Sequence, residues 1–381
     1  MIAPGAGSGS GAKRARVLVV GPVPPPAHGC AVIIRNMLAS SLTERFELLH
    51  LDTSDRRGLE NIGRLDAGNV WRAGVHGTRF LRMLASQRPD LVYITLAQNT
   101  WGFLRDALFL SPTTLRRTCC VVHFQSGQFD TFYDSAQPPV RQLVRMLLPR
   151  VDRAVVLGHT FTNMLDGLVS RDRIDVVPNA VPDPGLVQRD RSGRRVRALY
   201  LGNLIPSKGY IDVVHAARDL TREGVDIDWV IAGGVSDPDA HQRALDVARE
   251  LGDRIRFTGP VDDAAKAKLL ADADMLVFPS RYENEGLPLV LLEAMAAGLP
   301  VVSTYHAAIP EVVQEGVTGL LVQPGDVAAL TAAIRRLAFE ADMRRGMGAA
   351  ARARFLEEYT VARWSERMAA VFDTALGVHA A

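Results

Sequence analysis

Short runs rich in Val, Ile and Leu alternate with segments of helical period along most of the chain. Such continuous apolar runs are typical of parallel strands buried on both faces by helices. In the first half the pattern predicts strands near residues 16–20, 46–51, 91–95, 119–123 and 153–157. In the second half it predicts strands near residues 196–201, 228–232, 255–258, 275–278, 301–303 and 319–322, with helices such as 209–223 and 288–297 between them. The sequence therefore predicts an α/β protein with two doubly wound halves.

Residues 183–197 separate the two series, because they show neither period and are rich in Pro, Gly and Arg. We therefore expect a first domain over residues 16–182, a linker over 183–197 and a second domain over 198–358, after a loose Gly/Ser-rich tail over 1–15. A length of 381 residues agrees with this division, since it exceeds what one hydrophobic core usually supports.

Composition narrows the class of protein. The 44 basic and 42 acidic residues give a net charge of only +2, which argues against a nucleic-acid-binding protein. Cys30, Cys119 and Cys120 lack the spacing of zinc ligands, and adjacent cysteines seldom bridge each other, so we expect a reducing compartment. No apolar run approaches the roughly 18 residues of a membrane span. These features predict a cytoplasmic protein.

Polar residues gather at the predicted strand ends. His28 and Gly29 follow the first strand, and His123 ends the fourth. In the second half, Lys208 follows the first strand and Glu285 follows the strand near 275–278. Ligands of open parallel sheets bind beyond the carboxyl ends of the strands. A cleft between two facing domains would collect all five residues.

The strongest local signal is FPSRYENEGLPLVLLEAMAAGLPVVST at residues 278–304, in which Glu285 and Glu293 lie eight residues apart. A fully helical interval of that length would span about 12 Å, similar to the reach from ribose to hexose in an extended nucleotide sugar. Ionised carboxylates accept hydrogen bonds from hydroxyls, and the helix start near Gly286 and Leu287 can face a diphosphate. Two isolated glutamates would otherwise be interpreted as capping or surface residues.

Motifs along nearly the whole chain resemble, in order, those of the retaining glycosyltransferase family 4, which has a glutamate-x7-glutamate motif. They are GPVPPPAHG at 21–29, VVHFQSG at 121–127, VVPNAV at 176–181, YLGNLIPSKG at 200–209 and IPEVVQEGVTGLLVQPGD at 309–326. The resemblance implies the GT-B fold, with two facing Rossmann-like domains and an interdomain cleft. It also implies that a C-terminal helix within residues 359–381 packs back onto the first domain.

The resemblance also assigns roles to single residues. Glu293 would hold the ribose hydroxyls, Glu285 would contact the transferred sugar and Lys208 would hold the diphosphate. His123 would lie beside the donor sugar, and the backbone at Gly29 would approach the phosphates or the acceptor. From the residues alone, Lys208 would by default be a solvated loop lysine, and His123 could equally be a structural histidine.

The predicted site has three parts. The catalytic residues are His123, Lys208 and Glu285. The donor-binding residues are Gly29, Asn203, Lys208, Gly233, Val261, Glu285, Gly286, Leu287 and Glu293. The acceptor side comprises His28, Gly29 and His123.

The chain departs from the family pattern in three places. Asn203 stands where an arginine is common, and Arg281 is a candidate to supply that charge. Gly286-Leu287-Pro288 directly follows Glu285, which leaves Glu283 as a rival for the first motif glutamate. Residues 307–308 are alanines where glycines are frequent, which predicts a narrower donor pocket.

The resemblance implies hexosyl transfer with retention from a nucleotide-diphosphate sugar, UDP first and GDP next, to a glycan, lipid-linked or small-molecule acceptor. Polysaccharide or glycoconjugate synthesis is the expected setting. A sugar-nucleotide epimerase or hydrolase, or a noncatalytic nucleotide-sugar-binding subunit, would fit the same fold. No cofactor or metal is expected, because the acidic triplets at 237–239 and 272–274 are interpreted as helix ends.

Residues 139–150 place arginines around an apolar face. Such a helix can lie on anionic lipid, although a partly buried helix of the first domain is favoured. Peripheral contact with the inner face of the cell membrane stays an alternative to a purely cytoplasmic protein.

Overall fold

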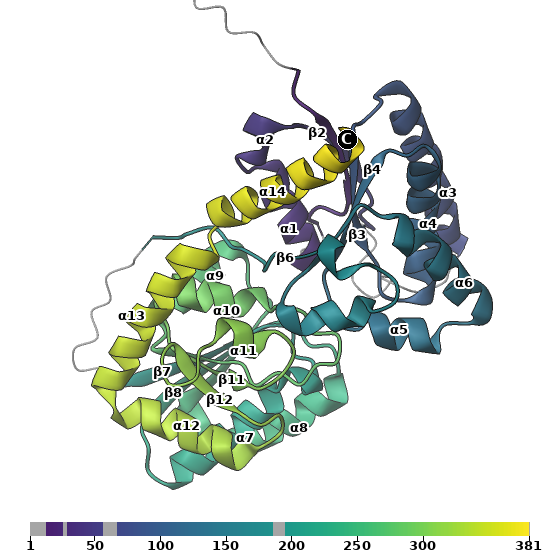
Figure 1. The fold of residues 1–381 in the computed structure, drawn as a ribbon. Coiled ribbons are helices and arrows are strands. Elements are labelled where there is room, and N and C mark those ends of the chain that lie inside the picture. Colours follow the sequence, from purple (N-terminus) through teal and green to yellow (C-terminus); the bar gives the residue numbers. More distant parts are fainter. Residues whose placement is uncertain (1–12, 26–28, 56–66, 186–194, 381) are drawn as a thin grey trace, which may run out of the picture.

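The computed structural model describes residues 13–25, 29–55, 67–185 and 195–380. Two lobes are visible, each with a parallel sheet between helices (Figure 1). The first sheet has the order β2-β1-β3-β4-β5-β6. Its strands are β1 (Arg16–Gly21), β2 (Glu47–Asp52), β3 (Leu91–Leu96), β4 (Cys119–Phe124), β5 (Arg153–Val156) and β6 (Ile174–Val176).

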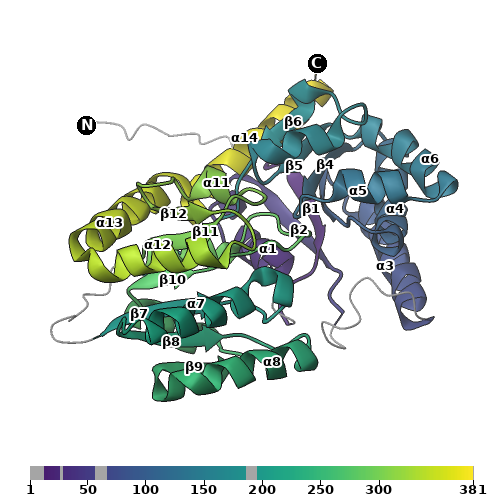
Figure 2. The same cartoon turned by 90° about the horizontal axis from the view of Figure 1, so that it is seen from below.

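The second sheet has the order β12-β11-β10-β7-β8-β9 and is also parallel throughout (Figure 2). Its strands are β7 (Val196–Leu201), β8 (Ile227–Ala232), β9 (Ile255–Gly259), β10 (Met275–Val277), β11 (Val301–Thr304) and β12 (Gly319–Val322). The predicted fold class is therefore confirmed.

Helices connect the strands of both sheets. Those of the first domain are α1 (Gly29–Leu38), α2 (Leu42–Arg45), α3 (Ala67–Ser86), α4 (Thr100–Leu115), α5 (Phe129–Ser135) and α6 (Pro138–Leu147). The second domain has α7 (Tyr210–Arg222), α8 (Pro238–Ala248), α9 (Asp263–Asp272), α10 (Leu289–Ala296), α11 (Ile309–Val312), α12 (Val327–Phe339) and α13 (Ala341–Glu358), and the chain ends in α14 (Val361–Ala380). Short 3₁₀ turns are η2 (Leu148–Arg150), η3 (His159–Leu165), η4 (Arg171–Arg173), η5 (Pro206–Lys208) and η6 (Arg249–Arg254).

All eleven predicted strands are present, and none of their ends is shifted by more than one residue. The missed strand is β6, whose three residues are only partly buried and include Asp175, which is paired with Arg153. The predicted linker 183–197 ends too late, because β7 begins at Val196. Its residues 186–194, and residues 1–12 of the predicted tail, lie outside the described ranges.

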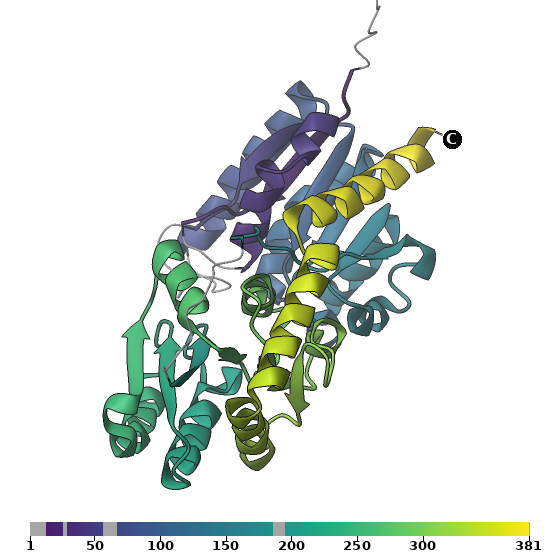
Figure 3. The same ribbon diagram turned by 90° about the vertical axis from the view of Figure 1, so that its left-hand side faces the viewer.

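The first sheet buries both faces, and alternate residues of each strand point to opposite sides. Val17, Tyr93 and Val121 belong to one apolar cluster, which receives Trp364 and Phe372 from α14. The Phe372 ring lies 5.5 Å from that of Phe46 and 5.9 Å from that of Tyr93. The last helix of the chain thus completes the core of the first domain (Figure 3).

The strand orders place a topological switch point in each sheet. In the first sheet, β1 has β2 on one side and β3 on the other. In the second sheet, β7 lies between β8 and β10. Connections leave the sheet in opposite directions at such points, so the strand ends there border an open crevice. The two crevices are where ligand sites are expected.

Direct hydrogen bonds join the two domains. The carboxylate of Glu311 accepts from the backbone N–H groups of His159 and Thr160, each at 2.7 Å. Asn179 Nδ2 donates to the carbonyl oxygen of Leu287 at 3.1 Å. These bonds join η3, which follows β5, to α11, and the segment after β6 to the loop that follows β10.

Phe372→Ala should lower the free energy of unfolding by about 3–5 kcal/mol, because it removes a fully buried ring shared with Phe46 and Tyr93. Chemical denaturation measures the change. Glu366→Ala on the same helix is the matched control, since Glu366 is 65% exposed and should shift stability by only about 0.5 kcal/mol. Equal effects of the two substitutions would show that α14 does not complete this core.

Candidate functional site

An ion pair forms at the switch point of the second sheet. Lys208, at the end of η5 after β7, lies 3.2 Å from Glu285 Oε2 and 3.3 Å from Oε1. Glu285 follows β10 and is 7% exposed. The lysine ammonium also lies 5.0 Å from the ring centre of Tyr282 and 5.8 Å from that of Phe278. A partly buried ammonium and a buried carboxylate therefore meet in one crevice, with aromatic faces beside the cation.

Neighbouring groups fix the Glu285 carboxylate. Ser280 Oγ donates to Oε2 at 2.9 Å, and the backbone N–H of Glu285 donates to the carbonyl of Tyr282 at 2.9 Å. Glu283 is exposed, and its backbone carbonyl accepts from Gln128 of the first domain. The turn thus brings Glu285 to the lysine and directs Glu283 to the surface, which favours Glu285 as the first motif glutamate.

The second glutamate has a lysine partner of its own. Glu293 lies in α10, and its Oε1 is 2.6 Å from Lys266 Nζ of α9. Lys266 also contacts Asp263 at 3.2 Å. Burial opposes the charge of Lys266, but the carboxylates of Glu293 and Asp263 raise its pKa above the usual value. Lys266 was not predicted from the sequence, because it comes from a separate helix.

Small residues allow backbones to approach closely around this pair. A Cβ on Gly286 would lie 2.6 Å from the carbonyl oxygen of Gln125 in the first domain. Gly233 has a φ of +153°, and a Cβ there would lie 1.8 Å from the carbonyl oxygen of Gly202. Leu287 is 4% exposed and bonded through its carbonyl to the first domain. Side chains at both glycines would push apart the loops that border the site.

The remaining predicted residues of the second domain differ in exposure and partners. Asn203 is exposed directly after β7, whereas Val261 is partly buried between β9 and α9. Arg281 is tied by its backbone N–H to Ser207, while its guanidinium is paired with Asp212. Arg281 is therefore beside the lysine loop, with its charge directed to α7.

Ala307 has a φ of +50°, the left-handed region in which glycine is favoured. This conformation is the physical reason for expecting glycine at that position. Ala308 is fully buried, and a Cβ built on Gly158 of the first domain would lie 3.0 Å from its own Cβ. Ala308 thus belongs to the domain contact.

His123 is fully buried at the end of β4. Its Nε2 is hydrogen-bonded to Gln125 Nε2 at 3.1 Å, and its Nδ1 is hydrogen-bonded to the Tyr93 hydroxyl at 2.6 Å. Burial lowers the pKa of His123 to about 3. The ring is a neutral, internal group that holds Gln125, whose carbonyl faces Gly286. It is not exposed to the crevice.

The residues predicted after the first strand are described only in part. Gly29 is the first residue of α1, is exposed and has open space where a side chain would stand. His28 lies outside the described residues. The acceptor-side roles of His28 and Gly29 therefore stay predictions.

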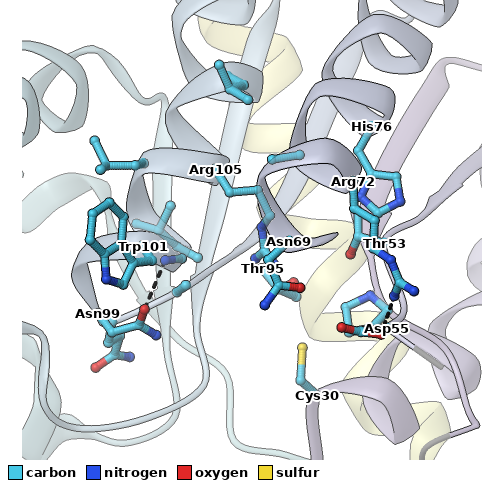
Figure 4. Close-up of a pocket in the computed structure, with 18 of the residues that line it drawn as sticks. Cys30, Thr53, Asp55, Asn69, Arg72, His76, Thr95, Asn99, Trp101 and Arg105 are labelled. Atoms are coloured by element: carbon cyan, nitrogen blue, oxygen red, sulfur yellow. Dashed lines mark hydrogen bonds and ion pairs between the residues drawn. The ribbon is translucent and has the colours of Figure 1, made fainter. Parts of the chain in front are cut away.

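A pocket of about 930 Å³ lies at the switch point of the first sheet (Figure 4). Thr53, Thr95 and Gln125 line it from the ends of three strands, and residues of α3 and α4 line the opposite wall. Tyr282 and Asn284 of the second domain also line it. Because Tyr282 contacts Lys208 as well, this pocket and the lysine–glutamate pair are neighbours.

Comparisons with known proteins decide the class of the second domain. Residues 195–339 match the family model of the glycosyl transferases group 1. The second domain is a glycosyl transferases group 1 domain. Every second-domain residue of the predicted site, from Asn203 to Glu293, lies in this glycosyl transferases group 1 domain, which confirms the resemblance seen in the motifs.

A relative and two solved structures extend this finding. The chain is 30% identical over 187 residues to alpha-D-kanosaminyltransferase of Streptomyces kanamyceticus, covering 48% of this chain and about half (47%) of that relative. Sucrose-phosphate synthase of Thermosynechococcus elongatus has a similar fold, with a TM-score of 0.73 at 17% identity over 96% of this chain and 100% of that chain. Anabaena HepE in complex with UDP has a TM-score of 0.73 at 15% identity over 94% and 100%. The fold is GT-B.

The described ranges contain neither a candidate metal cluster nor a membrane-spanning helix. No group of three or more His, Cys, Asp and Glu side chains there is arranged to hold a metal ion. None of the helices in the same ranges is long and apolar enough to cross a bilayer. Among the acidic triplets, Asp237 caps α8 and Asp272 ends α9, as predicted.

His123 should make stability fall in acid. Its folded pKa of about 3 lies below the unfolded value of about 6.5, so the unfolded chain binds more protons between these values. This contribution is complete above about pH 6.5 and is lost as pH falls, with a slope approaching about 1.4 kcal/mol per pH unit. Denaturation across pH 4–8 should show a shallower acid slope for His123→Gln than for the parent protein. His159→Gln, at an exposed histidine, should keep the parental slope. Parallel profiles of all three proteins would contradict a neutral His123.

Proposed function

We propose that the protein transfers a sugar, with retention, from a nucleotide-diphosphate donor to an acceptor hydroxyl in glycoconjugate or polysaccharide synthesis. The observation that carries the proposal is the Lys208–Glu285 pair at the switch point of a glycosyl transferases group 1 domain. UDP is the first candidate nucleotide, since a protein of similar fold is known in complex with UDP. GDP is the next.

Each end of the donor has a matching charged group. In the proposal, Lys208 leaves Glu285 in part to neutralise the diphosphate, whose charge grows as the glycosidic bond breaks. Glu293 accepts hydrogen bonds from the ribose hydroxyls, with Lys266 holding its carboxylate in place. The proposed site needs no resident metal, because the lysine supplies the positive charge at the diphosphate.

Glu285 is better suited to orient the sugar than to attack it. Both of its oxygens contact Lys208, and Oε2 also accepts from Ser280. A carboxylate engaged in this way is a weak nucleophile, so we propose attack by the acceptor on the face that the diphosphate leaves. The acceptor oxygen forms the new bond to C1, the bond from C1 to the diphosphate oxygen breaks, and the diphosphate takes the hydroxyl proton. His123 contributes by holding Gln125 against Gly286.

The acceptor is proposed to bind in the pocket of the first domain. That pocket is lined by Gln125 and reaches Tyr282, which lies beside Lys208.

Peripheral membrane contact through α6 has weaker support in the structure than it has in the sequence pattern. Val140, Val144 and Leu147 of this helix are buried, which leaves mainly its arginines and Met146 on the surface.

Lys208→Ala and Glu293→Ala should each weaken binding of the preferred nucleoside diphosphate. A lost hydrogen bond to a charged group costs about 1.5–3 kcal/mol, which corresponds to roughly a 10- to 150-fold rise in Kd. Calorimetry with UDP, GDP, ADP and dTDP measures the loss, and thermal unfolding checks that each variant is folded. Lys268→Ala is the control, because Lys268 is 78% exposed on the same helix as Lys266. A folded parent protein that binds none of the four nucleotides would sink the proposed function.

Glu285→Ala should reduce the rate of sugar release or transfer by roughly 100-fold or more, if its contacts are made in the transition state. Glu283→Ala, at the exposed rival position, should stay within about twofold of the parent protein. The assay follows loss of nucleotide sugar and the anomeric configuration of the product. A reversal of the two effects would assign Glu283 as the motif residue, and a glycosyl adduct on Glu285 would contradict the proposed attack.

Complete loss of activity in chelator, restored by manganese, would contradict the metal-free site.

A further inference from the structure

The first-domain pocket differs in chemistry from one part to another, and this gradient bears on which acceptor it takes. Gln125, Ser126, Tyr282 and Asn284 line the part nearest the donor domain. These side chains offer hydrogen bonds and no charge. The Tyr282 ring is also 5.0 Å from the ammonium of Lys208, so a hydroxyl held here would lie near the donor site.

Two arginines line the middle of the pocket. Arg105 extends from α4 between Trp101 on one side and Arg72 on the other (Figure 4). Its Nε and Nη2 contact Asp106, whose side chain is only 2% exposed and also accepts from the backbone of Ala97. Asp106 therefore lies behind the guanidinium, and the arginine presents its remaining edge to the pocket.

The other charged groups that face this part are Arg72, Asp55 and His76. Arg72 is paired with Asp55, which is largely buried at the pocket wall. The pKa of His76 is lowered, first by burial and then by the positive charges of Arg105 and its arginine neighbours. Arg72 and Arg105 are thus each paired with one carboxylate, and both still line the pocket with guanidinium N–H groups that those carboxylates do not use.

The outer part of the pocket is apolar and unusually exposed. Val70, Trp101 and Leu108 line it, and they are 59%, 46% and 45% exposed. Trp71, next to Val70 on α3, is 74% exposed. Residues 67–88, which contain α3, include four arginines and no acidic residue. Apolar side chains next to cationic ones are typical of surfaces that contact amphiphiles with anionic groups.

We propose that this pocket binds an acceptor in which a phosphate ester joins the sugar-receiving group to an apolar chain. The phosphate lies between Arg72 and Arg105, where guanidinium groups bind phosphate oxygens in paired hydrogen bonds. The chain lies on Val70, Trp101 and Leu108, and the receiving hydroxyl points to Gln125 and Tyr282. A neutral glycan would use the amides but would make no charged contact with the arginines and would leave the apolar wall exposed. This inference rests on the proposed function.

The test measures binding of simple probes to the full-length protein by calorimetry. Farnesyl phosphate, kept below its micelle concentration, should bind at least tenfold more tightly than farnesol and than inorganic phosphate. Dihexanoyl phosphatidylglycerol, also as a monomer, tells whether an isoprenoid or a glycerolipid chain is preferred. Either preference supports a phosphate ester on an apolar chain.

Substitutions locate the site. Arg105→Gln and Arg72→Gln should each raise the Kd of farnesyl phosphate at least fivefold, and Trp101→Ser should do the same by removing the apolar wall. Arg82→Gln is the matched control, because Arg82 is an exposed arginine of α3 that does not line the pocket. It should change the Kd less than twofold. Thermal unfolding and binding of UDP or GDP are measured for every variant to show that the fold and the donor site are intact.

Three outcomes would overturn the inference. Equal affinities for farnesol and farnesyl phosphate would show that the arginines do not bind the phosphate group. An equal effect of Arg82→Gln would indicate general surface attraction instead of a site. Absence of farnesyl phosphate binding by protein that binds nucleotide would refute the acceptor class and leave the proposed function standing. Absence of both would refute the proposed function as well.

Discussion

The close contact between the backbone of Gln125 and Gly286 determines how the two domains meet. It brings the end of β4 against the residue that follows Glu285, at a distance that leaves no room for a Cβ. The carbonyls of Glu283 and Leu287 accept side-chain hydrogen bonds from the same domain, so the loop is held on both sides of the glutamate. The first domain therefore helps to position an acid that belongs to the second.

Both motif glutamates are paired with lysines in the protein without ligand. Lys208 contacts Glu285 and Lys266 contacts Glu293, and both pairs are partly or largely buried. Removing one partner of such a pair leaves an uncompensated charge, which is costly in a poorly hydrated site. When a dianionic diphosphate binds, Lys208 would have to contact it and still keep part of its contact with Glu285. The hydroxyl of Ser280 is placed to keep one oxygen of that carboxylate satisfied.

Most of the fold could be predicted from the sequence, because strands that are buried on both faces appear there as continuous apolar runs. β6 was missed since it is three residues long and carries Asp175. Lys208 and Glu285 were predicted to converge because both follow strands of one parallel sheet. The choice between Glu283 and Glu285 needed the turn closed by the Tyr282 carbonyl, which spacing does not reveal. Lys266 and the first-domain pocket were also missed, because the residues that form each site come from elements distant along the chain. Burial of His123 was equally invisible, because it depends on Tyr93 and α14.

The position of α14 has a consequence for how the protein is made. Trp364 and Phe372 belong to the core of the first domain, yet they are synthesised after the whole second domain. While the second domain is being synthesised, the face of the first sheet that carries Val17, Tyr93 and Val121 lacks its cover. Domains usually fold in order of synthesis, the N-terminal one first. Here the core of the first domain is completed only when α14 has been synthesised. A nascent chain stalled before α14 would present an apolar sheet face to chaperones.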